Sequence, residues 1–147
     1  MTDSIRQQII TALDTRLKTI KKTASYKTDA GNNVFDWLDR DLADSELDAI
    51  VYRDKTNEIS AEGFDVSGNR VRVEIEAKTK QASGTAARLR EIIEDIYKAI
   101  GTDESFGGLA IESSPAGESI DIDQVDTIRG NATIAIDISY MSPKWGY

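Results

Sequence analysis

The sequence of 147 residues contains no cysteine and no histidine. The absence of both residue types excludes disulfides, thiolate nucleophiles, the usual Cys/His zinc sites and the Ser-His-Asp triad. Histidine is also the commonest general base near neutral pH, so much of the usual catalytic repertoire is missing. The composition therefore narrows the chemistry that this chain could carry out.

Long apolar runs and an excess of basic charge are missing as well. No run of 18 apolar residues occurs, so no membrane-spanning helix and no membrane partner are expected, and residues 1–4 do not resemble the start of a signal peptide. The formal net charge is −8. Because nucleic acid is bound mainly through clusters of Lys and Arg, this charge argues against stable nucleic-acid binding.

Two segments have the apolar periodicity of amphipathic helices. Residues 3–23 carry apolar side chains at helical spacing, and Ser4 with Gln7 resembles a capping box at their start. Residues 86–100 form the second predicted helix, with Ser83 or Thr85 as its N-cap and Gly101 as its C-terminal cap. The expected buried stripe of this second helix is Leu89, Ile92, Ile93, Ile96 and Ile100.

Two other segments alternate strictly between apolar and polar residues. Residues 70–78 place Val71, Val73, Ile75 and Ala77 on one side and charged residues on the other, and residues 132–140 repeat the pattern. Strands that bury one face favour an antiparallel or mixed sheet. The chain is therefore predicted to be one α+β domain spanning residues 1–147, with about four to six strands and two main helices on one face of the sheet.

The remaining elements are less sharply defined. Residues 47–53 and 57–64 are predicted as strands separated by a turn at residues 54–55, and residues 67–69 are predicted as a second turn. Residues 106–113 are predicted as a strand and residues 114–119 as a loop, while residues 120–128 are ambiguous.

One charged pattern suggests metal-dependent nuclease chemistry. Glu76 and Lys78 lie on one face of the predicted strand, and Asp54 or Asp65 upstream could complete a Mg²⁺ site of the restriction-nuclease kind. Alternating Glu and Lys is, however, ordinary on a half-exposed strand, and the acidic chain lacks the basic surface that DNA binding needs. The nuclease is therefore kept as an alternative of a different class.

Two further polar segments are interpreted structurally. Asp121, Asp123 and Asp126 lack the glycine and the final glutamate of a calcium-binding loop, so we expect a solvated acidic edge. Residues 101–108 are glycine-rich but match no phosphate-binding motif, so we expect a connection between helix and strand.

Several stretches together resemble the tail terminator family of siphophages, of the minor tail protein U type. The most specific stretch joins residues 99–103 to residues 106–110, and the acidic residues 118–126 depart most from the pattern. The resemblance covers nearly the whole chain in order. Its other parts are the first helix over residues 5–20, residues 26–31, Val34 and Phe35, residues 47–54, and Tyr140, Pro143 and Trp145 near the end.

This resemblance implies a structural virion protein that is not an enzyme and that uses no metal and no organic cofactor. Such a subunit would form a homo-hexameric ring on the last ring of the tail tube, stop tube polymerisation and offer the head-side joining surface. Its partners would be copies of itself, the tail tube protein and the head–tail connector protein, and DNA would only pass through the lumen. The location would be the head-proximal end of the phage tail, after assembly in the host cytoplasm.

Aromatic residues and arginine are the usual anchors of protein interfaces. On that ground the candidate contacts with neighbouring subunits or the tube are Phe35, Trp37, Arg40, Phe64, Trp145 and Tyr147. Other neck, connector or completion proteins are the alternative within the structural class. An acidic interaction module or inhibitor is a further alternative.

Overall fold

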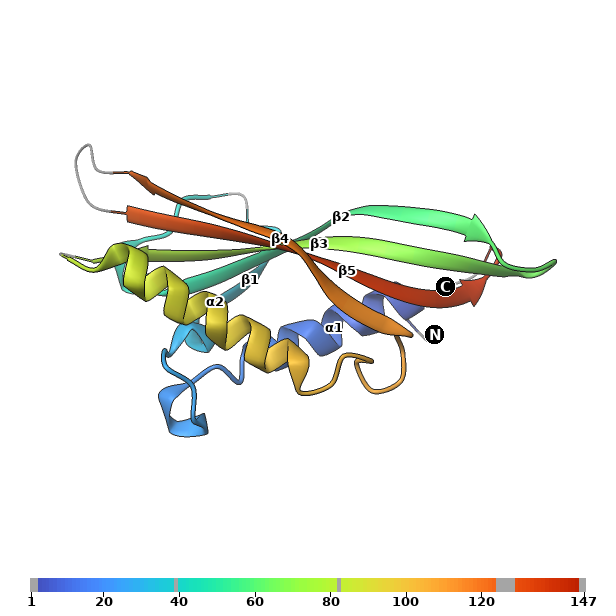
Figure 1. Cartoon of the computed structure of the whole chain (residues 1–147), viewed down its shortest axis with the longest axis horizontal. Helices are drawn as coiled ribbons and strands as arrows, with labels where there is room; N and C mark the ends of the chain where they lie inside the picture. The colour runs from blue at the N-terminus through green and yellow to red at the C-terminus, as the bar shows by residue number, and fades with distance from the viewer. Residues whose placement is uncertain (1–2, 39, 82, 124–128, 146–147) are drawn as a thin grey trace.

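The computed structural model describes residues 3–38, 40–81, 83–123 and 129–145. These residues form two α-helices and five strands, as Figure 1 shows. In chain order the elements are α1 (Ile5–Leu17), β1 (Val34–Asp36), β2 (Ala49–Ala61), β3 (Val66–Lys80), α2 (Thr85–Gly101), β4 (Glu112–Asp123) and β5 (Arg129–Pro143).

The strands form a single mixed sheet in the order β1-β2-β3-β5-β4. β1 runs parallel to β2, and every other neighbouring pair is antiparallel. Both helices lie on the same face of this sheet (Figure 1). The predicted α+β class, the number of strands and the placement of the helices are therefore confirmed.

The core forms where the alternating strands meet the helix stripes. In the β3–β5 register, Val71 lies opposite Ile138 and Ile75 lies opposite Ile134, and all four are almost completely buried. The predicted stripe of α2, from Leu89 to Ile100, is buried against them. Apolar alternation on strands and a 3.6-residue period on a helix thus build the same core from two sides.

The first helix is shorter than predicted. It begins after Ser4, whose hydroxyl accepts a hydrogen bond from the Gln7 backbone at 3.0 Å, and it ends at Leu17 rather than near residue 23. The carbonyl of Ile20 accepts from the backbone N–H of Gly31 at 2.9 Å. A Cβ on Gly31 would lie 2.6 Å from that carbonyl oxygen, so only glycine allows this close approach.

β2 and β3 are longer than the sequence suggested. Residues 54–55 are a bulge within one continuous strand rather than a turn between two strands. Residues 67–69 are also not a turn, because they lie inside β3, where Ser67 and Asn69 are buried. The reversal occurs at residues 62–65 instead.

The segment before β5 also differs from the prediction. Residues 102–109 form turns after α2, and β4 then includes residues 114–119, which were predicted as a loop. Pro115 is tolerated because β4 is an edge strand, and a bulge between Pro115 and Gly117 absorbs the irregular backbone. The N-cap of α2 is Gly84, without a side-chain bond, rather than Ser83 or Thr85.

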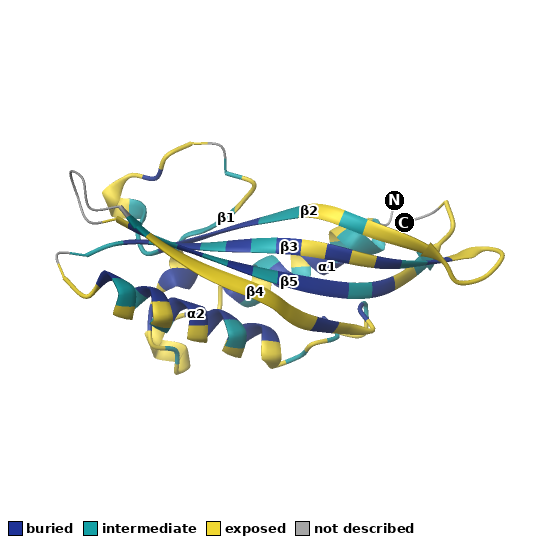
Figure 2. Cartoon of the chain, turned by 45° about the horizontal axis from the view of Figure 1, so that its top comes forward, coloured by how far each residue is buried: buried dark blue, intermediate teal, exposed yellow. Residues whose placement is uncertain are grey.

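The sheet extends beyond its helical cover. In Figure 1 the turn between β2 and β3 lies past the N-terminus of α1, near the end of β5 and the C-terminus. Figure 2 shows that this turn and most of β4 are exposed. No helix among the described residues has the length and apolar character needed to cross a membrane.

A buried carboxylate on α2 holds the long connection after α1. Asp95 is 2% exposed, and it accepts hydrogen bonds from the backbone N–H groups of Lys27 at 3.0 Å and Thr28 at 2.9 Å. The hydroxyl of Thr28 donates a third bond at 2.7 Å. This contact fixes residues 26–31, one of the stretches that carry the resemblance.

We predict that Asp95→Asn lowers the free energy of unfolding by about 2–4 kcal/mol. The amide has one acceptor oxygen where the carboxylate has two, so a donor in this buried site loses its partner. Urea denaturation at neutral pH measures the change, as a lower midpoint at unchanged slope.

The matched control is Glu94→Gln, one residue earlier on the same helix. Glu94 pairs with Lys27 at 2.7 Å, but both side chains are more than half exposed, so little stability should be lost. An equal effect of the two substitutions would refute the role assigned to Asp95.

Candidate interaction surface

Large apolar side chains are exposed together at the end of the sheet that the helices leave uncovered. Phe64 is 91% exposed and Trp145 is 86% exposed. The two are brought to one end because the Lys144 backbone N–H donates to the Asp65 carbonyl at 2.8 Å. We call this end the apolar tip; it consists of Ile59, Phe64, Val66, Met141 and Trp145, and the strand registers place Ile59 on one face of the sheet and Val66 and Met141 on the other.

Two of the six residues predicted as contacts therefore belong to the tip, namely Phe64 and Trp145. Tyr147 lies outside the described residues. The tip residues that sequence reasoning missed are Ile59, Val66 and Met141. Each lies in a strand, and the sequence does not show that this part of the strand extends beyond the helices.

The other three candidates contact their own chain. Phe35 is partly buried against Leu42, Ala49 and Val51 on the open face of the sheet. The Arg40 guanidinium lies 5.8 Å from the centroid of the Phe35 ring and pairs with a glutamate at 2.8 Å. These contacts stabilise the loop after β1, so Phe35 and Arg40 are already engaged.

Trp37 is partly exposed, like the tip residues, and also bonded to its own chain, like Arg40. Its ring is 46% exposed, but its indole N–H donates to Asp54 at 2.8 Å. Arg6 donates to the same carboxylate at 2.8 Å. The indole is therefore held at the start of the protruding part of β2.

Both outer edges of the sheet lack a strand neighbour over most of their length within the described part of the chain. β1 pairs only with residues 50–52 of β2, so residues 55–61 present an unpaired edge. β4 is the opposite edge. Such edges are sites where another chain can add a strand.

The face of the sheet opposite the helices carries a ladder of ion pairs. Arg72 pairs in a bidentate manner with Asp137 at 2.8 and 3.0 Å, across the β3–β5 register. The hydrogen bond from Arg72 holds the pKa of Asp137 below its ordinary value, against the opposing effect of burial. Charged side chains on neighbouring strands thus pair across this face.

Of the nuclease candidates, Glu76 and Lys78 belong to these ion pairs, whereas Asp54 and Asp65 lie away from them. Glu76 pairs with Arg53 at 2.5 Å and with Lys78 at 3.2 Å. Asp54 pairs with Val73 in the β2–β3 register and therefore points to the helix-covered face. Asp65 lies in the turn at the tip, eleven residues from Glu76 and thus about 35 Å away along β3.

The four nuclease candidates therefore do not converge. No group of three or more potential metal-binding Asp, Glu, His or Cys residues occurs among the residues that the structure describes. Of the acidic segment considered for calcium, Asp121 is exposed on β4, and Asp126 lies outside the described residues.

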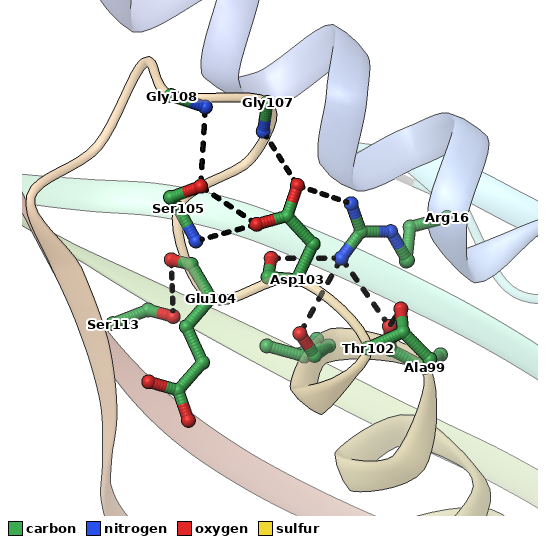
Figure 3. Close-up of polar contacts among 10 residues, drawn as sticks. Arg16, Ala99, Thr102, Asp103, Glu104, Ser105, Gly107, Gly108 and Ser113 are labelled. Carbon is green, nitrogen blue, oxygen red and sulfur yellow. Dashed lines mark hydrogen bonds and ion pairs between the residues drawn. The ribbon is translucent and has the colours of Figure 1, made fainter.

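The most specific stretch of the resemblance includes the loop after α2, which Figure 3 shows. We call residues 102–109 the locked loop, because hydrogen bonds within it hold its shape. Asp103 accepts hydrogen bonds from the Ser105 hydroxyl at 2.6 Å, the Ser105 N–H at 3.0 Å and the Gly107 N–H at 2.8 Å. The bond from the Ser105 hydroxyl is the main reason that the pKa of Asp103 lies below its ordinary value. Gly107 and Gly108 adopt positive φ, where glycine is favoured.

Arg16 of α1 joins this loop to the end of α2. Its guanidinium donates to the carbonyls of Ala99 at 3.4 Å, Ile100 at 3.3 Å and Asp103 at 2.9 Å (Figure 3). The Ala99 carbonyl also accepts from the Thr102 hydroxyl at 2.8 Å, and the Ile100 carbonyl accepts from the Asp103 N–H at 3.3 Å, so Arg16 adds a further donor to each. The guanidinium also lies 5.4 Å from the centroid of the buried Phe106 ring.

The locked loop forms one wall of a groove between α2 and β4. The groove has a volume of about 440 Å³ and is lined by Tyr97, Ile100, Glu104, Pro115 and Ile136, among others. The Tyr97 hydroxyl donates to Glu118 of β4 at 2.7 Å. Burial, and then this bond, raise the pKa of Tyr97 to about 12, so the phenol stays neutral at physiological pH.

We predict that Asp103→Asn destabilises the chain in a pH-dependent way. The folded state lowers the pKa of Asp103, so its contribution is complete above the unfolded pKa of about 3.9 and is lost as the pH falls through the folded pKa. The difference in unfolding free energy between the parent and Asp103→Asn should be constant from pH 7 to about pH 5 and shrink below about pH 4. Urea denaturation across this pH range tests it.

Glu104→Gln is the matched control, since only the backbone carbonyl of Glu104 accepts from Ser113, at 3.0 Å. The control should follow the parent at every pH. A difference for Asp103→Asn that grows on acidification would contradict the assigned role.

The described surface thus combines an apolar tip, two largely unpaired edges, a charged face and a groove. None of these features by itself identifies a family. No family model matches the chain, and no curated protein matches its sequence.

Proposed function

We propose that the chain is a structural virion protein, a tail terminator subunit of a siphophage. Copies form a hexameric ring on the end of the tail tube, stop its polymerisation and present the surface that joins the head. The subunit acts in the head-proximal end of the tail after assembly in the host cytoplasm. The resemblance of the residue pattern to that family supports the assignment, and the exposed surfaces support a role in assembly.

The apolar tip is the observation that carries this proposal. Phe64 and Trp145 are both more than four-fifths exposed, at the end of a sheet that projects past α1. Large apolar side chains gathered in one exposed place mark a site of protein contact. A projecting tip suits contact with the rim of a cylinder, where each subunit must reach one subunit of the ring below.

Ring closure requires a heterologous contact, in which two different surfaces of each subunit meet. The chain has such different surfaces, because the tip is apolar at one end of β5 while the groove lies beside the middle of the same strand. The two unpaired sheet edges add further contact area. The formal charge of −8 also suits a ring through which DNA passes without sticking.

A connector or completion protein of the neck is the nearest alternative. Its exposed tip would meet a head protein rather than the tail tube. Binding to isolated tail tubes therefore separates the two assignments.

We predict that the purified chain caps one end of tail tubes from the phage that carries it. Negative-stain electron microscopy should show extra density at that end, and added chain should halt growth of tubes from tube subunits. Phe64→Ser should remove most of the capping, because a buried aromatic anchor contributes at least about 2 kcal/mol to an interface.

Ile120→Ser is the matched control, since Ile120 is also exposed, at 42%, but lies on β4 away from the tip. It should cap like the parent. Both variants should keep the parent's stability within about 0.5 kcal/mol. Tubes that grow normally beside an excess of folded parent chain would refute the assignment.

A further inference from the structure

We propose that Trp145 of one copy inserts into the groove between α2 and β4 of the next copy, with Lys144 against its acidic rim. The occupant of the groove is therefore a second copy of this chain. The inference rests on the proposed function, because it names the subunit contact that a ring needs.

The groove has an apolar floor and an opening. Ile100 and Ile136 are almost completely buried at its base, and Pro115 of β4 forms one side. Gly101 leaves space, because a Cβ built on it would meet no atom within 4 Å. A volume of about 440 Å³ lies in the range of sites that enclose an organic ligand, so it accommodates an indole ring.

Charge decides which aromatic residue of the tip fits this groove. The rim carries the exposed residues Glu104 and Glu118. Phe64 lies between Glu62 and Asp65, which the rim would repel. Trp145 follows Lys144, whose ammonium lies 5.6 Å from the centroid of the indole, so Trp145 brings a positive charge with its ring.

The contact must be between molecules. Ile136 in the groove and Pro143 at the end of β5 are seven residues apart on one strand, a distance of about 23 Å. Trp145 follows Pro143 at the tip, and its neighbour Lys144 is bonded to Asp65. Each copy therefore offers one indole and one groove at separate places, which is the arrangement of a heterologous contact.

Sedimentation velocity over a concentration series tests this contact on the full chain. The parent should self-associate, and its tryptophan emission should shift to the blue as Trp145 becomes buried. Trp145→Ser should weaken association by about 30-fold. Gly101→Leu should do the same by filling the groove, and it places no strain on the helix because Gly101 has no positive φ.

A charge exchange distinguishes a specific contact from general stickiness. Lys144→Glu should weaken association by about tenfold, and combining it with Glu104→Lys should restore it. Lys21→Glu is the control, since this exposed lysine near the end of α1 gives the same change in net charge. The same variants are then tested for capping of tail tubes.

The outcomes separate this inference from the proposed function. If the parent caps tubes and Gly101→Leu and Lys144→Glu cap equally well, the groove contact is refuted while the terminator role stands. If the parent self-associates through Trp145 but caps no tube, the contact stands and the terminator role is refuted. If the parent is monomeric alone but caps tubes, loss of capping in Lys144→Glu and its recovery with Glu104→Lys support the contact.

Discussion

Helices cover only one face of the sheet in this protein, and the strands run past the helices that cover that face. β3 and β5 each have 15 residues and so extend about 50 Å, and the end that carries the β2–β3 turn projects beyond α1. Where the cover ends, apolar residues such as Phe64 and Trp145 remain in water. Such exposure is unfavourable for an isolated chain, because burial of an apolar side chain contributes about 1.5–3 kcal/mol, and a partner can recover this free energy.

The elements with one strict period were predictable, and the irregular ones were not. β3, β5 and the stripe of α2 follow from alternation or helical spacing alone. Residues 67–69 have the composition of a turn, but Gly68 lies in a strand whose neighbouring side chains, from Ser60 and Glu62, fill the space of its missing Cβ. Pro115 indicates a loop by itself, yet an edge strand tolerates the lost N–H. Local propensity was overridden in both places by pairing with β5.

The site residues divide along a similar line. Composition identified aromatic residues and arginine as candidates, but it could not show which of them make contacts within the chain. Phe35 and Arg40 stabilise the loop after β1, while Phe64 and Trp145 are left exposed. The buried Asp95 was not predicted, because a single acid on an apolar stripe gives no signal until the backbone N–H groups that it binds are known. The residues that carry the family resemblance, such as Gly31 and Asp103, turn out to build the fold.

Charge sets the conditions under which copies of this chain can meet. Each copy carries a formal charge of −8, so two copies repel each other at distances beyond contact. Salt at physiological strength screens this repulsion beyond about 8 Å, whereas a lysine seated against a glutamate in a partly dry groove is screened much less. A contact between Lys144 and Glu104 therefore opposes the long-range repulsion only after the surfaces have come together. If the proposed contact forms, this balance favours association at high protein concentration, or where a template already holds the subunits side by side.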